Sequence, residues 1–117
     1  MKVSTLLLRI ISVGALVAGS GALAAEGEPA SGKGKTSMCV GCHGIAGYRT
    51  VFPDVYHVPK LGGQHASYLV KALKDYKSGA RKNPIMALLV ANLTQRDIED
   101  LAAYYSGQRG LVTKYWD

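Results

Sequence analysis

Apolar positions recur with helical spacing in two stretches of the chain. In residues 64–78 they fall at i, i+3, i+4 and i+7, at Leu69, Ala72, Leu73 and Tyr76. The same spacing follows residue 94, at Ile98, Leu101, Ala102 and Tyr105. Because residues at these intervals share one face of an α-helix, the pattern predicts two amphipathic helices, each with one side to bury.

Turn and capping residues mark the ends of these helices. Gly79 is placed to end the first helix. Thr94 and Asp97 resemble a capping box, with Asp in place of the usual Glu, and predict the start of the second. Gly107 and Gly110 lie just past its end. No alternating strand pattern is present, so the sequence predicts an all-α domain.

The segments between the expected helices are rich in turn residues. Residues 44–63 hold six glycines and prolines, at Gly44, Gly47, Pro53, Pro59, Gly62 and Gly63. They predict a long loop, which inside a compact domain needs a functional reason such as a bound cofactor. A short helix is expected over residues 32–40. Residues 80–84 form a turn-rich link before a short apolar segment that contains Met86.

The first 24 residues have the pattern of a secretory signal peptide. Lys2 and Arg9 precede an apolar stretch, and Ala22-Leu23-Ala24 is a small-x-small cleavage site, with Ala25 the alternative cleavage point. We therefore expect export to the periplasm, a mobile arm over residues 25–31 and one domain over residues 32–117. An uncleaved anchor is the alternative, but the apolar stretch is short for a membrane span.

The charge balance is moderately basic. The chain carries 14 Lys+Arg against 8 Asp+Glu, a formal net charge of +6. Two of the bases lie in residues 1–24, which leaves 12 against 8 after cleavage. This bias suits an acidic protein partner, whereas nucleic-acid sites show denser basic stripes. We expect neither nucleic-acid binding nor stable membrane insertion once the signal is removed.

The run Cys39-Val40-Gly41-Cys42-His43 has the spacing of a c-type haem attachment site. Each thiol can add across one haem vinyl group, and the histidine then supplies a nitrogen to the iron. A redox disulfide or half of a zinc site is the alternative. However, no strand is expected before Cys39, and the chain has no other cysteines. We therefore expect one covalently bound haem c and no disulfide.

The sixth ligand of the iron has three candidates. Met86 comes 43 residues after His43, beyond a whole helix, so the chain can pass around the haem and present the thioether from the opposite face. His57 or His65 would instead give a bis-histidine site. Met86 could also be an ordinary core methionine. An open sixth site would then suit a haem sensor or enzyme.

An ordered series of residues resembles a class I cytochrome c. The series comprises Gly32, Cys39 to Gly44, Pro59-x-Leu61-x-Gly63-Gln64, Tyr68-Leu69, Gly79-x-Arg81, Met86, Leu93-Thr94 and Asp97-Ile98 through Leu101-Ala102 to Tyr104. It is most similar to one haem unit of bacterial cytochrome c4, or to short c553-type proteins. The resemblance implies a small cytochrome c fold, with three to five helices around one haem. The single CxxCH departs from the two-unit layout of cytochrome c4, and the segment from Gly47 to Pro59 is longer than usual.

The resemblance also implies roles for individual residues. His43 and Met86 would be the axial iron ligands, and the Pro59 carbonyl would accept a hydrogen bond from the His43 ring. Gly32 would let the first helix cross close to Tyr104. Four more residues would lie against the haem or its propionates: Leu101, Tyr105, Tyr68 and Arg81.

The expected function is electron transport, not catalysis. A haem whose axial positions are both filled by side chains passes one electron but does not readily bind oxygen. The resemblance implies donors such as a bc1-type complex or a periplasmic dehydrogenase, and acceptors such as a terminal oxidase or another reductase. A haem subunit fixed in a dehydrogenase complex is the alternative. Four lysines could steer docking onto an acidic partner or form a solvated face: Lys71, Lys74, Lys77 and Lys82.

Overall fold

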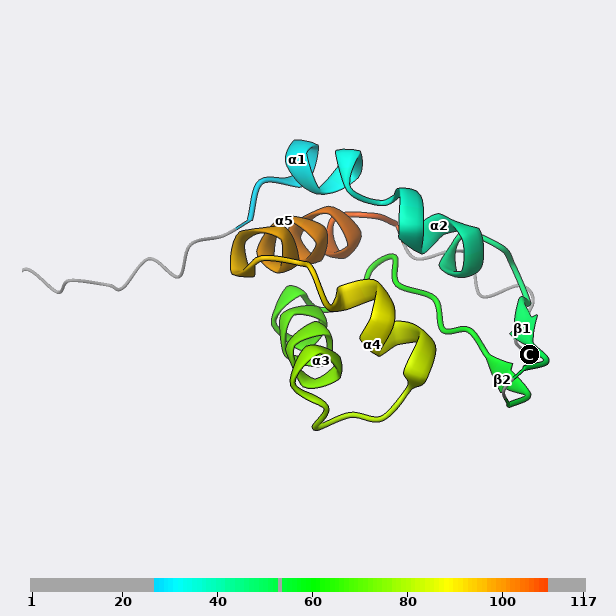
Figure 1. Cartoon of the computed structure of the whole chain (residues 1–117). Coiled ribbons are helices and arrows are strands. Elements are labelled where there is room, and N and C mark those ends of the chain that lie inside the picture. The colour runs from blue at the N-terminus through cyan, green and yellow to red at the C-terminus, as the bar shows by residue number, and fades with distance from the viewer. Residues whose placement is uncertain (1–26, 53, 110–117) are drawn as a thin grey trace, which may run out of the picture.

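The computed structural model describes residues 27–52 and 54–109, most of them helical. The two long helices are α3 (Ala66–Ser78) and α5 (Gln95–Ser106). The shorter elements are α1 (Pro29–Gly34), α2 (Ser37–His43), α4 (Pro84–Val90) and the strands β1 (Arg49–Thr50) and β2 (Tyr56–His57). Figure 1 shows α1 and α2 along one side of α5, with α3 and α4 on the other. These five helices confirm the predicted fold class.

Helix α1 crosses α5 at Gly32, which is buried. A Cβ atom at this position would lie 2.0 Å from the backbone oxygen of Asp100 and 2.9 Å from Cβ of Tyr104. Only a glycine allows the two backbones to approach so closely. The close crossing of the first helix against Tyr104, which the family resemblance implies, is therefore present.

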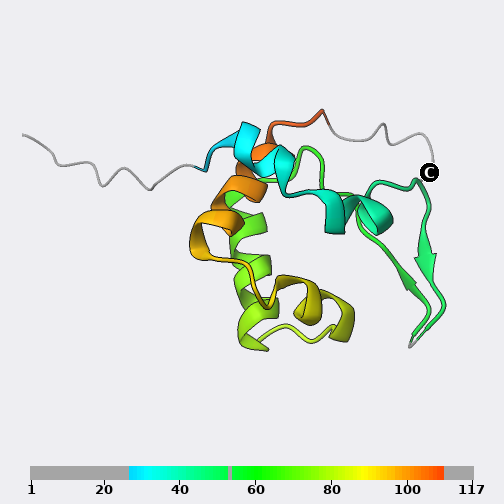
Figure 2. The ribbon, with the colours of Figure 1, turned by 45° about the horizontal axis from the view of Figure 1, so that its top comes forward.

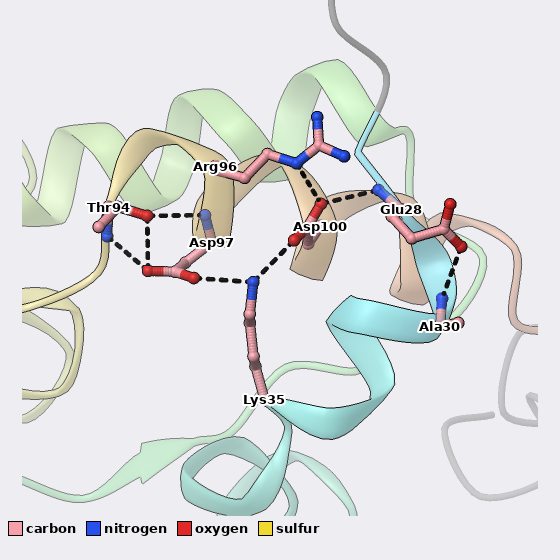
Figure 3. Close-up of polar contacts among 7 residues, drawn as sticks. All are labelled: Glu28, Ala30, Lys35, Thr94, Arg96, Asp97 and Asp100. Carbon is pink, nitrogen blue, oxygen red and sulfur yellow. Dashed lines mark hydrogen bonds and ion pairs between the residues drawn. The ribbon is translucent and has the colours of Figure 1, made fainter.

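The prediction of a mobile N-terminal arm over residues 25–31 is wrong for residues 29–31, because α1 begins at Pro29. Proline suits the first turn of a helix, where its missing N–H would have had no partner. Glu28 precedes it as the N-cap, and its carboxylate accepts a hydrogen bond from Ala30 N–H at 3.3 Å. The Glu28 N–H donates to Oδ1 of Asp100 at 2.7 Å, so the start of α1 is tied to α5 (Figure 3).

Asp100 is the buried centre of a polar network whose other side chains are partly exposed (Figure 3). It is 1 % exposed, and Lys35 Nζ lies 2.7 Å from its Oδ2, while Arg96 Nε lies 3.0 Å from its Oδ1. Lys35 also reaches Asp97 at 2.8 Å. Hydrogen bonds from Lys35 and from Glu28 N–H favour the ionised carboxylate and lower the pKa of Asp100 to about 2. The network fastens α1 and the α1–α2 junction to α5.

The single helix expected over residues 32–40 is divided into α1 and α2. Lys35 caps the end of α1, and its backbone N–H donates to Gly32 O. Thr36 then precedes α2 and directs its hydroxyl to Lys33 O at 2.9 Å. The break lies where the Lys35 side chain turns to the two aspartates of α5, so tertiary contacts override the local helical pattern.

The ends of the two long helices agree with the sequence patterns. Gly79 has φ +82°, a left-handed conformation that ends α3. Thr94 forms the predicted capping box, with its hydroxyl accepting from Asp97 N–H at 3.1 Å. α3 begins at Ala66, two residues later than expected. The buried apolar residues of the described chain are Leu69, Val90, Ile98, Leu101 and Ala102.

Three elements were not expected from the sequence, namely two strands and one helix. The long loop contains an antiparallel pair of strands, in which Arg49 is opposite His57 and Thr50 is opposite Tyr56. These strands are two residues long, too short for an alternating pattern to be visible. Helix α4 occupies the apolar segment around Met86. Figure 2 shows the strand pair standing out beyond α2, away from the packed helices.

The predicted signal peptide, residues 1–24, lies outside the described residues, as does Gly110. Over the described ranges, no helix is long and apolar enough to cross a membrane.

Candidate haem-binding site

A cavity of about 360 Å³ lies between α2, the strand pair and helices α3, α4 and α5. The four apolar residues that the sequence places on one face of α3 all line it. Three of the four on α5 do so too: Leu101, Ala102 and Tyr105. The amphipathic faces therefore enclose a cavity as well as packing together, which leaves room for a large apolar group.

Both cysteines and the histidine of the CxxCH motif line this cavity, because α2 presents them between Cys39 and its end at His43. Cys39 and Cys42 are free thiols. Burial raises the pKa of the Cys39 thiol, while the hydroxyl of Tyr105 acts in the opposite direction. Two thiols one helical turn apart, beside an imidazole, face the same apolar space.

The His43 ring is oriented by the backbone of the long loop. Its Nδ1 lies 2.7 Å from the Pro59 carbonyl oxygen. Because a carbonyl can only accept, Nδ1 carries the proton, and in the neutral ring Nε2 keeps its lone pair. A neutral imidazole with Nε2 free is the form that binds a metal, and such a contact fixes ring orientation.

Met86 lines the same cavity from α4. Asn83 is the N-cap of this helix, and its side-chain oxygen accepts from Met86 N–H at 3.0 Å. Pro84 follows at the first helical position. This cap fixes the turn that carries Met86. Among the described residues that line the cavity, neither His57 nor His65 is found.

The residues present fit a haem c. The cavity offers two thiols, an imidazole and a thioether within a mostly apolar lining. Tyr105 adds a buried hydroxyl that has no hydrogen-bond partner among the described residues. A zinc site fits less well, since within those residues no three His, Cys, Asp or Glu side chains gather to hold a metal ion.

Sequence reasoning missed the contribution of the strand pair. Thr50 of β1 and Tyr56 of β2 line the cavity, as does Val58, which follows β2. The length of the Gly-rich and Pro-rich loop was the available signal, but its pairing could not be inferred. Tyr68 and Arg81 do meet at the cavity, where Arg81 Nη1 donates to the Tyr68 hydroxyl at 3.3 Å.

Comparison with known proteins agrees with this geometry. The chain matches the cytochrome c family over residues 31–107. It is 40% identical over 85 residues to cytochrome c-554(548) of Halomonas halodenitrificans, covering 70% of this chain and 98% of that protein. It is 38% identical over 97 residues to cytochrome c4 of Stutzerimonas stutzeri, covering 75% of this chain and 44% of that protein. The crystal structure of reduced cytochrome c4 from Pseudomonas stutzeri superposes with a TM-score of 0.53 at 34% identity, covering 71% of this chain and 50% of the other.

The chain therefore belongs to the cytochrome c family, and its fold is that of a cytochrome c4 unit. Members of this family bind covalently attached haem c, and the single CxxCH motif provides for one. The chain spans about half the length of the cytochrome c4 relatives that it matches.

Proposed function

We propose that this chain is a periplasmic, single-haem cytochrome that carries one electron at a time between protein partners. One observation carries the proposal. His43 of α2 and Met86 of α4 line the same cavity as the two attachment cysteines. A haem held by this set would have both axial positions filled by side chains, which suits electron transfer and not oxygen chemistry.

In this proposal each residue has a distinct role. Cys39 and Cys42 form thioethers that prevent dissociation. His43, oriented by Pro59, supplies the first axial nitrogen, and Met86 supplies the second axial ligand. A thioether ligand and an apolar lining both favour the reduced iron, since neither stabilises the extra positive charge of Fe(III).

The partners are other redox proteins with acidic docking surfaces. A bc1-type complex or a periplasmic dehydrogenase would donate, and a terminal oxidase or another reductase would accept. The contacts of the four lysines named above indicate which of them are available to meet a partner. Lys71 is partly neutralised by its ion pair with Asp75, and Lys77 keeps its charge but is held by a hydrogen bond to a backbone carbonyl. Lys74 and Lys82 are exposed, and Lys82 lines the cavity, which makes it the best placed to meet a partner.

The proposal is tested by spectra of the purified protein, oxidised and reduced, with and without carbon monoxide. We expect a low-spin spectrum in both states, a weak long-wavelength band when oxidised, and no carbon monoxide binding when reduced. Intact mass should exceed that of the polypeptide by one haem that acid–acetone does not extract. Rapid carbon monoxide binding by the reduced protein would instead favour a haem sensor or enzyme.

A further inference from the structure

Tyr105 has a buried hydroxyl that makes no hydrogen bond of normal geometry with the described residues, although it lies close enough to the Cys39 thiol for each group to shift the pKa of the other. The residue lies in the last turn of α5 and lines the cavity together with Cys39. Its backbone carbonyl accepts from Gly63 N–H at 2.9 Å, and its ring contacts Tyr104 edge-on with 5.2 Å between the centroids. The backbone of Tyr105 is therefore fixed and its ring is packed against Tyr104, while its hydroxyl has no hydrogen bond of normal geometry.

A buried hydroxyl without a partner is costly, so such a group is normally satisfied in the functional state. Burial raises the pKa of Tyr105, and the neighbouring Cys39 thiol adds to this effect. The hydroxyl therefore stays protonated and can donate. Once Cys39 is bonded to haem, its sulfur is a thioether, which accepts hydrogen bonds but cannot donate them.

We infer that Tyr105 is a positioning residue for the attached cofactor, with its hydroxyl donating a hydrogen bond to the thioether sulfur of Cys39. This inference rests on the proposed haem attachment at Cys39. The bond would satisfy the hydroxyl and fix the rotamer of Cys39. It would also draw electron density from the sulfur, which favours the reduced iron, because hydrogen bonds around a haem tune its potential.

Tyr105→Phe keeps the ring and removes only the hydroxyl, and Tyr104→Phe on the same helix is the matched control. In the holoprotein, Tyr105→Phe should lower the reduction potential, so that the equilibrium constant for reduction of the iron falls by at most about tenfold. The equilibrium constant for folding should also fall by at most about tenfold, which is the range for one hydrogen bond. Tyr104→Phe should change the potential little. If the Tyr105 hydroxyl is unpartnered in the mature protein, Tyr105→Phe should instead stabilise the fold and leave the potential unchanged, which would overturn the inference.

The role of the sulfur is tested by a double-mutant cycle with Cys39→Ala, which retains attachment through Cys42. In that background Tyr105→Phe should no longer shift the potential. An undiminished shift would assign the hydroxyl to another acceptor and overturn the inference, while leaving haem attachment and electron transfer intact. Should the variants not accumulate, resonance Raman spectra of the wild-type tyrosines decide the matter. We expect the signal of a hydrogen-bond-donating tyrosine whose hydroxyl proton is protected from exchange with solvent in the folded holoprotein, and the lack of any such signal refutes the bond.

Discussion

At the scale of single residues, two candidate iron ligands are positioned by hydrogen bonds that involve the backbone. His43 is held by the Pro59 carbonyl, and Met86 is placed by the cap at Asn83. The accepting atom in each contact belongs to an uncharged group. The two candidate iron ligands are therefore positioned by hydrogen bonds to neutral atoms, within a mostly apolar lining of the kind that raises a haem potential.

Replacing Met86 tests the second axial ligand. In Met86→Ala the thioether is lost, so the weak long-wavelength band should disappear, the reduction potential should fall, and the reduced protein should bind carbon monoxide. Visible spectroscopy and redox titration measure all three. Leu88→Ala is the control, because Leu88 lies on the same helix but is 77% exposed. If Met86→Ala leaves the spectrum and potential unchanged, the ligand is another residue, with His57 and His65 the next candidates.

Asp100 gives the fold an acid-sensitive contact. Its pKa is lowered from an ordinary value near 4 to about 2 in the folded protein, so the carboxylate stabilises the fold fully above about pH 4. This contribution is lost as the pH falls toward 2. Asp100→Asn should therefore be less stable than the wild type at pH 7, and the difference should narrow between pH 4 and pH 2.

Denaturant unfolding followed by circular dichroism at each pH measures this difference. Asp75→Asn is the control, since Asp75 makes an i,i+4 pair with the exposed Lys71, a type worth about 0.3–0.5 kcal/mol. A constant gap between Asp100→Asn and wild type from pH 7 to pH 2 would contradict the assignment.

At the scale of elements, the crossing of α1 and α5 holds the haem-binding helix in place. Two residues, Lys35 and Thr36, separate α1 from α2, and Lys35 is paired with Asp97 and Asp100 of α5. Movement of α1 would therefore displace the cysteines and His43 relative to the cavity. The close approach at Gly32 is the part of this arrangement that tolerates least change.

Gly32→Ala tests this crossing. The added methyl group would lie 2.0 Å from a backbone oxygen, so the helices must separate, and we expect a loss of about 1–3 kcal/mol in the free energy of unfolding. Gly34→Ala in the same helix is the matched control, because nothing lies within 4 Å of its added carbon. That change should be neutral or slightly stabilising. Thermal and denaturant unfolding compare the two, and equal effects would show that the crossing is not tightly packed.

How far the sequence predicts these elements depends on whether their causes are local. The end of α3 at Gly79 and the start of α5 at Thr94 are predicted correctly, because each depends on a residue and its near neighbours. Asn83 followed by Pro84 is a similar local signal, which could have shown the start of α4. The paired strands depend on contacts across the chain, and their short segments carry no periodic pattern. The early start of α1 has both kinds of cause, because Glu28 and Pro29 are local capping signals, whereas the hydrogen bond from Glu28 N–H to Asp100 is long-range.

In the candidate site, too, features with local causes can be predicted from the sequence, and features that depend on the fold cannot. The CxxCH motif is enough to predict that the two cysteines and His43 act together, because its chemistry depends on spacing alone. Placing Met86 in the cavity requires the fold. The unsatisfied Tyr105 hydroxyl cannot be found from the sequence, since an amphipathic pattern gives the face of a residue but not the partner of its polar atom.

At the scale of the whole molecule, the apolar faces of α3 and α5 form part of a small core and also line the cavity. Leu69, Leu101 and Ala102 are buried and also line the cavity. A domain of this size has a marginal core. A covalently attached apolar cofactor would complete that core, so binding and folding are linked. The same arrangement places the cavity near basic residues, where charge can guide an approaching partner.

The last prediction concerns this charge. Oxidation of the reduced protein by ferricyanide, a small anion, should slow as ionic strength rises, because salt screens its attraction to a basic protein. Lys82→Glu should reduce the rate at low salt, by up to about tenfold, since Lys82 lines the cavity. Lys33→Glu changes the net charge equally but lies on α1, so it should have a smaller effect. Stopped-flow measurements over a range of salt concentrations compare the variants. Equal slowing by both would show that net charge alone, and not a basic surface beside the haem, governs the encounter.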